Sequence, residues 1–261
     1  MEVLTLLLSG AVAGTLAGLL GIGGGVIIVP VLAMVFEAQG ISIDVLMHVS
    51  IGTSLATIVI TSISSIRAHQ KRQAIDWRLF RTITPGIMLG GFLGAAIAKL
   101  IPGEQLRLIF SVVMLLIAAQ MYFGNASKPH RKLPGTPGIL AAGGVIGAIA
   151  SMVGVGGGSM SVPFLTWCNV SIRNAVATSA AIGLPIAIAG TSGFIVSGWG
   201  VDARPVWSLG YVNLPAFFSI VAASTLFAPV GAWLTHRISP VILKRFFAFF
   251  LLILGLRMLF T

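Results

Sequence analysis

Two short glycine blocks are the part of this sequence whose residue types and spacing could bind a ligand. "GIGGGVIIVP" occupies residues 21–30, and "GVGGGSMSVP" repeats its glycines, valine and proline at residues 154–163. The first block carries no charged residue, so neither a nucleophile nor a metal cage is available there. Glycine leaves backbone N–H groups accessible, and a helix that begins after such a block directs unpaired N–H groups and its positive dipole end at the turn. These residues could therefore bind an anion without a charged side chain.

A threonine–serine pair follows each glycine block and adds hydroxyl groups to the candidate site. Residues 48–56 resemble residues 174–182, and the Thr-Ser pair recurs in the second segment. Thr57 and Thr61 extend the helical face of the first pair, where their hydroxyls either contact the ligand or bond to carbonyls of their own helix. The predicted ligand-binding residues are Gly21, Gly23, Gly24, Gly25, Thr53, Ser54, Gly154, Gly156, Gly157, Gly158, Thr178 and Ser179.

The composition places these residues in a membrane protein. The chain has 261 residues, of which 57% are hydrophobic and 8% are charged, whereas a soluble domain is about 25% charged. Six apolar runs are each close to the roughly 20 residues that cross a bilayer: 45–66, 82–101, 106–123, 175–196, 211–235 and 241–260. The net charge of +10 is typical of Lys and Arg in loops that set membrane orientation, so no nucleic-acid partner is expected.

Enzymatic and metal chemistry have little support in the sequence. The four histidines are scattered, and the six acidic residues lie in or near predicted loops. Cys168 has no Cys or His neighbour at metal-ligand spacing, and we expect it to be a small apolar residue near a helix end. We expect His48 at a membrane interface. The glycine blocks lack the βαβ context of a dinucleotide fingerprint. The chain is therefore expected to be no enzyme, with no metal and no cofactor.

The sequence is also duplicated. Residues 75–123 align with 212–260 at a constant shift of 137. The expected organisation is a single transmembrane domain made of repeat 1 at residues 1–126, a basic linker at residues 127–133 and repeat 2 at residues 134–261. The most basic loop lies before the third apolar segment of repeat 1 but one loop later in repeat 2, as expected if one repeat is inverted. An inverted arrangement puts twelve of the sixteen Lys and Arg residues on one side, against ten for a parallel one.

Inversion requires an odd number of crossings in each repeat. Each repeat has three good spans plus a glycine-interrupted segment, whose parts at 3–19 and 26–36, and at 138–153 and 159–168, are short for a crossing. We therefore predict an all-α integral membrane protein with two inverted repeats, each with a glycine-broken re-entrant helical hairpin plus three transmembrane helices. The alternative is eight conventional transmembrane helices with the N-terminus inside. The two glycine breaks would meet near the membrane midplane, where transporters bind substrate. The alternative role of the glycines is only to allow helices to pack closely.

The doubled motif resembles the sulfite exporter TauE/SafE family of membrane permeases. The resemblance rests on both glycine blocks, both Thr-Ser pairs, the Pro85-Gly86 pair, and Gly94 with its counterpart Gly231. It implies secondary or facilitated transport of a small inorganic or organic sulfur anion, such as sulfite or sulfoacetate, by a multi-pass protein of the bacterial cytoplasmic (inner) membrane. The alternative is a non-transporting structural or assembly subunit. The anion, the direction, the coupling ion and whether the protein forms a homo-oligomer stay open.

The inverted topology predicts the side of the membrane that each of two loops faces. A cysteine introduced at position 40 should react with an impermeant maleimide from outside, and one at position 130 only from inside. The two variants are Gly40→Cys and His130→Cys in a Cys168→Ser background. The opposite accessibilities would contradict this topology.

Overall fold

The computed structural model describes residues 7, 8, 10–12, 14, 15, 25–71, 73–123, 133–235 and 240–260, without the side chains of 228–235 and 240–244. Gly21, Gly23 and Gly24 of the first glycine block lie outside these residues. The described helices are α2 (Gly25–Ala38), α3 (Ile43–Gln70), α4 (Trp77–Lys99), α5 (Gly103–Phe123), α6 (Thr136–Val153), α7 (Gly158–Trp167), α8 (Ile172–Ser197), α9 (Leu214–Thr235) and α10 (Pro240–Phe260). An antiparallel pair, β1 (Ser208–Leu209) and β2 (Val212–Asn213), precedes α9.

The helices confirm an all-α membrane protein. In the described part of the chain, five helices are long and apolar enough to cross a membrane: α3, α4, α5, α6 and α8. Four of these match predicted spans, and the predicted spans at 211–235 and 241–260 are also helical, as α9 and α10. The fifth, α6, has 18 residues, so its length alone does not distinguish the predicted half-helix from a full crossing.

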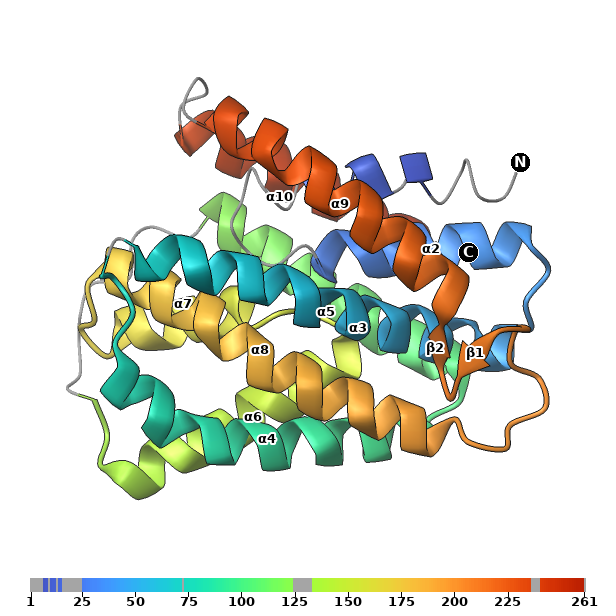
Figure 1. Ribbon diagram of the computed structural model, residues 1–261, viewed down its shortest axis with the longest axis horizontal. Helices are drawn as coiled ribbons and strands as arrows, with labels where there is room; N and C mark the ends of the chain where they lie inside the picture. Colours follow the sequence, from blue (N-terminus) through green and yellow to red (C-terminus); the bar gives the residue numbers. More distant parts are fainter. Residues whose placement is uncertain are drawn as a thin grey trace.

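The chain breaks and turns back between α6 and α7. Gly154 ends α6 in the left-handed conformation, with φ of 71°, which glycine adopts without steric cost. Helix α6 runs parallel to α4, and the start of α8 lies beside the start of α4 through a hydrogen bond from Asp76 N to Thr178 Oγ1. Helix α7 therefore returns to the end of the bundle at which α6 begins, the left-hand end in Figure 1. This path is that of a hairpin.

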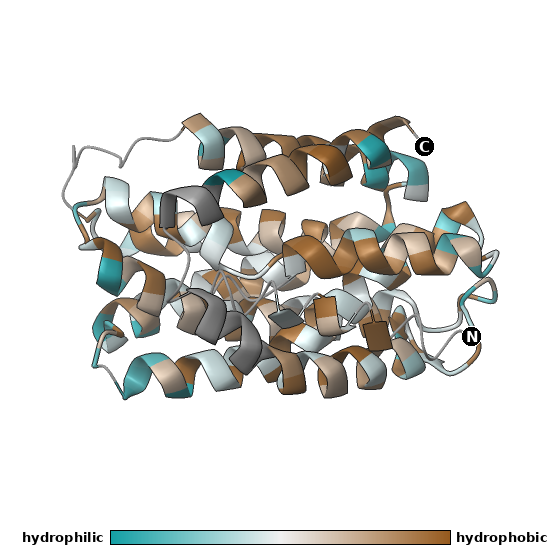
Figure 2. Cartoon of the chain, turned by 90° about the horizontal axis from the view of Figure 1, so that it is seen from above, coloured by the Kyte–Doolittle hydropathy of each residue, from teal (hydrophilic) through white to brown (hydrophobic). Residues whose placement is uncertain are grey.

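The two helices that carry the Thr-Ser pairs form the centre of the bundle. Of the most apolar 18-residue stretch of each helix, 78% is buried in α3 and 61% in α8, against 33–39% in α4, α5 and α6. Figure 2 shows apolar residues along the outer helices, where the surface is suited to lipid. Apolar side chains such as Leu89 and Phe123 are exposed there. Burial thus separates a central pair of helices from a lipid-facing layer.

Small residues bring α4 and α6 into backbone contact. A β-carbon added at Gly86, Gly90 or Gly94 would overlap a backbone carbonyl of α6, at Leu140, Gly144 and Ala148 respectively. The four-residue spacing keeps all three glycines on one face of α4. Small residues at such spacing allow membrane helices to pack closely, so the packing role is real for these glycines.

The α4–α6 contact leaves no room for a methyl group at Gly90 of α4 but leaves room for one at Gly144 of α6. Gly90→Ala should lower the free energy of unfolding by about 1–3 kcal/mol, because the new methyl overlaps the Gly144 carbonyl. Gly144→Ala is the matched control, since its added β-carbon meets only the Gly86 oxygen, at 3.7 Å. Thermal unfolding in detergent measures both, and equal stability of the two variants would contradict this packing.

Candidate functional site

The second glycine block packs directly against the last glycine of the first. Gly25, the first residue of α2, has no room for a side chain: a β-carbon there would lie 2.5 Å from the Gly154 carbonyl oxygen and 3.2 Å from Val155 Cα. The start of α2 therefore meets the C-terminal end of α6. Both α2 and α7 begin at the last glycine of their block, as the sequence predicts. The structure thus brings the start of α2 and the break between α6 and α7 together in the interior.

A serine from the first Thr-Ser pair satisfies the broken end of α6. Ser54 Oγ donates a hydrogen bond to the Gly154 carbonyl oxygen at 3.0 Å, and the contact is buried. The last carbonyls of a helix have no partner within the helix, so this hydroxyl stabilises the break. The serine of the second pair lies at the start of α7, where a β-carbon added at Gly157 would be 3.0 Å from the Ser179 carbonyl oxygen.

Each threonine of the pairs holds the start of a helix from the other repeat. Thr53 Oγ1 accepts a hydrogen bond from Asn213 N at 2.9 Å, and Thr178 Oγ1 accepts one from Asp76 N at 3.0 Å. These contacts join residues at equivalent positions of the two repeats, in opposite order. The threonines, predicted as ligand-binding residues, therefore also bind backbone at the bundle centre.

The residues that these threonines hold are helix caps, as their position in the sequence predicts. Asp76 Oδ1 accepts from Leu79 N and Asn213 Oδ1 accepts from Ala216 N, both at 3.0 Å. The side chain of each cap thus accepts a hydrogen bond from an amide of the helix that it starts. The backbone amide of the same cap residue donates to a threonine in the other half of the chain. The constant shift of 137 relates the two caps, but no sequence signal pairs either cap with its threonine.

Buried hydroxyl groups without a partner surround the second break. Ser151, Ser161 and Ser179 are fully buried, and their Oγ atoms have no hydrogen bond in the described part of the chain. Ser151 lies in the last turn of α6, Ser161 in the first turn of α7, and Ser179 on α8. A buried hydroxyl left unpaired costs about 1–3 kcal/mol. A polar ligand or water at this break would remove that cost.

The start of α7 supplies further donors beside these hydroxyls. Its cap residue, Gly157, provides no side-chain hydrogen bond to the first amides of α7, which have no partner within the helix itself. The positive end of the helix dipole lies at the same position. Gly156 and Gly157 are buried and Gly158 is half-buried. The site therefore combines N–H and O–H donors in a water-poor interior, a combination that favours a negatively charged ligand.

Three other polar residues have structural roles. Thr57 and Thr61 donate to the carbonyls of Ser54 and Ile58 within their own helix, which decides between the two roles that the sequence allows. His48, expected at a membrane interface, is buried within the protein: its Nε2 lies 3.0 Å from the Ala98 carbonyl oxygen, and its ring centroid is 5.0 Å from that of Tyr211.

Comparison with known proteins decides the family. The family model described as "Sulfite exporter TauE/SafE" matches residues 6–258. The chain belongs to this family. Helix breaks, unpaired donors and apolar outer helices are thus features of a membrane transporter, not of an enzyme.

Curated relatives support the same assignment over the whole chain. A "Probable membrane transporter protein" of Haemophilus influenzae is 38% identical over 257 residues, which cover 98% of this chain and 97% of that protein. A relative with the same description from Methanocaldococcus jannaschii is 28% identical over 97% of this chain and 94% of its own length. One from Bacillus subtilis is 29% identical over 76% of this chain and 80% of its own length. No solved structure matches the chain.

The cross-repeat hydrogen bonds predict an unequal effect of two threonine substitutions. Thr53→Val should lower the free energy of unfolding by about 1–3 kcal/mol, because it leaves the buried Asn213 amide without an acceptor. Thr57→Val should cost less, because the Thr57 hydroxyl only donates to a carbonyl of its own helix. Chemical unfolding of the purified transporter measures both, and an equal loss in the two variants would refute the role of Thr53.

Proposed function

We propose that this transporter moves a small sulfur-containing anion, such as sulfite, a sulfonate like sulfoacetate or a related organosulfur compound, by secondary or facilitated transport. The anion binds where the two glycine blocks meet. The observation that carries the proposal is the contact of Gly25 with Gly154, beside buried hydroxyls that have no partner in the described chain. The name of the matched family supports the substrate class.

The chemistry of the site suits an oxyanion. Several oxygens of a sulfite or sulfonate group accept hydrogen bonds at once, and charge-assisted hydrogen bonds are stronger than neutral ones. The proposed donors are the amides at the starts of α2 and α7, together with the Ser161 and Ser179 hydroxyls. Ser161 is an addition to the residues predicted from sequence. The proposed site also includes the residues predicted from the sequence, namely the glycines of both blocks and the two Thr-Ser pairs.

The proposed mechanism uses two inverted repeats that rock against each other around this site. The crossed pairs Thr53–Asn213 and Thr178–Asp76 support the symmetry, because the same contact forms twice with the repeats exchanged. The hairpin of α6 and α7 supports re-entrant segments over eight conventional spans. Rocking of one repeat against the other exposes a midplane site alternately to the two sides. No nucleotide-hydrolysing motif occurs in the sequence, so transport requires no ATP site.

Removal of an unpaired hydroxyl separates ligand binding from folding. Ser179→Ala should leave thermal stability unchanged or slightly higher, because the hydroxyl has no partner in the described structure. The same variant should lower transport about tenfold, as expected for loss of one hydrogen bond to a charged ligand. Ser50→Ala is the control, since its hydroxyl donates to the Leu46 carbonyl of its own helix and lies outside the proposed site.

Flux of radiolabelled sulfite, sulfoacetate and thiosulfate into proteoliposomes is the measurement. Gly24→Leu and Gly157→Leu, assayed for membrane insertion alongside, should abolish flux of the transported anion. Full flux in Ser179→Ala or Gly157→Leu would overturn the site. Absence of flux for all three anions in the reconstituted wild-type protein would favour the alternative of a structural subunit.

A further inference from the structure

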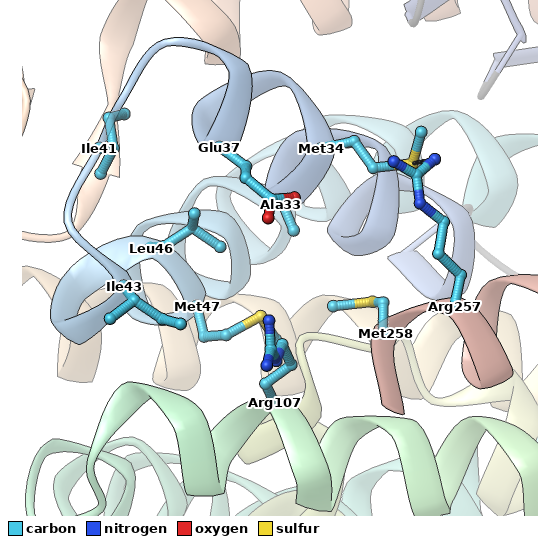
Figure 3. A pocket seen from close by; sticks show the side chains of 10 residues that line it. All are labelled: Ala33, Met34, Glu37, Ile41, Ile43, Leu46, Met47, Arg107, Arg257 and Met258. Atoms are coloured by element: carbon cyan, nitrogen blue, oxygen red, sulfur yellow. Dashed lines mark hydrogen bonds between the residues drawn. The ribbon is translucent and has the colours of Figure 1, made fainter. Parts of the chain in front are cut away.

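A second candidate site lies at one end of the bundle, away from the glycine breaks. A cavity of about 90 Å³ lies among α2, α3, α5 and α10, and Figure 3 shows the side chains that line it. A single water needs only about 10–15 Å³, so a small organic molecule fits. Along α2, roughly 18 Å of helix separates Gly25 at the central break from Glu37 at the cavity, at 1.5 Å per residue.

Opposite charges reach this cavity from different helices. Glu37 comes from α2, Arg107 from α5 and Arg257 from α10. In Figure 3 the Glu37 carboxylate and the Arg107 guanidinium point into the same space from opposite walls. Among the described residues, neither a hydrogen bond nor an ion pair joins these two groups. The cavity therefore separates a fixed negative charge from a fixed positive one.

The space between the charges is apolar. Met47 and Met258 are buried and line the cavity together with Met34. Arg257 Nη1 donates to Met34 Sδ at 3.4 Å, which ties the guanidinium to α2. Thioether and methylene groups fit irregular apolar shapes. The walls thus match a short hydrocarbon segment between two charged ends.

We propose that this cavity binds a small zwitterion whose ammonium group pairs with Glu37 and whose acidic oxygens pair with Arg107. A simple anion would face the Glu37 carboxylate as well as the Arg107 guanidinium, and a simple cation would face the guanidinium as well as the carboxylate. A molecule that carries both charges matches both side chains. The arrangement is independent of the central site, since the two sites share no residue.

Isothermal titration of the purified transporter in phosphatidylcholine nanodiscs tests this site with three matched probes. β-Alanine carries both charges, whereas propanoate and propylamine carry one each on the same three-carbon chain. β-Alanine should bind at least about tenfold more tightly than either, because removing one charge-assisted hydrogen bond weakens binding by about that factor. Equal binding of β-alanine and propanoate, or no binding of β-alanine, would overturn the proposal.

Substitutions of the charged groups give effects of opposite sign. Glu37→Gln should weaken β-alanine about tenfold and strengthen propanoate, whereas Arg107→Gln should weaken both. Glu104→Gln and Lys99→Gln are the controls, because both side chains are exposed and neither lines the cavity. Ser179→Ala should leave β-alanine binding unchanged. Failure of the zwitterion proposal is therefore distinguishable from failure of the proposed anion site at the glycine blocks. Weakened propanoate binding in Glu37→Gln would refute the assignment.

Discussion

A helix that breaks inside a membrane protein exposes backbone N–H and C=O groups that lipid cannot satisfy, and the core of this transporter depends on how they are satisfied. Ser54 Oγ bonds the Gly154 carbonyl at the end of α6. The nearby serines have no such partner in the described structure, and Gly157 at the start of α7 has no side chain that could cap the helix. One side of the break is therefore closed by protein, and the other side carries the unpaired hydroxyls on which the proposed anion site rests.

The need for close approach explains the rest of the architecture. The break can be covered only if Gly25 contacts the Gly154 backbone, which requires α3 and α8 to be buried between the hairpin and the outer helices. The glycine face of α4 brings α6 to that position. The lipid-facing helices are correspondingly less buried than the central pair. Close packing is therefore one role of these glycines, and the proposed anion site would depend on the same close approach.

Most of the helices and the second break follow from the sequence, because apolar runs and glycine blocks are local signals. The pairing of Thr53 with Asn213 does not, since it joins residues 160 positions apart and each partner alone is an ordinary helix residue or cap. His48 shows a related limit: its neighbours in sequence do not reveal its contacts with Ala98 and Tyr211, which lie on other segments. The terminal cavity depends on side chains from four helices, and no spacing in the chain indicates it.

The crossed threonine contacts also govern the order of assembly. The amide of Asp76 at the start of α4 donates to Thr178, which lies 102 residues later in the chain. Thr53 accepts from Asn213, which lies 160 residues later. A chain that ends before residue 178 therefore lacks the partners of the Thr53 hydroxyl and the Asp76 amide, and both hydrogen bonds need the second half of the chain. The two halves of the chain are thus completed together, because each supplies an acceptor for a backbone amide of the other.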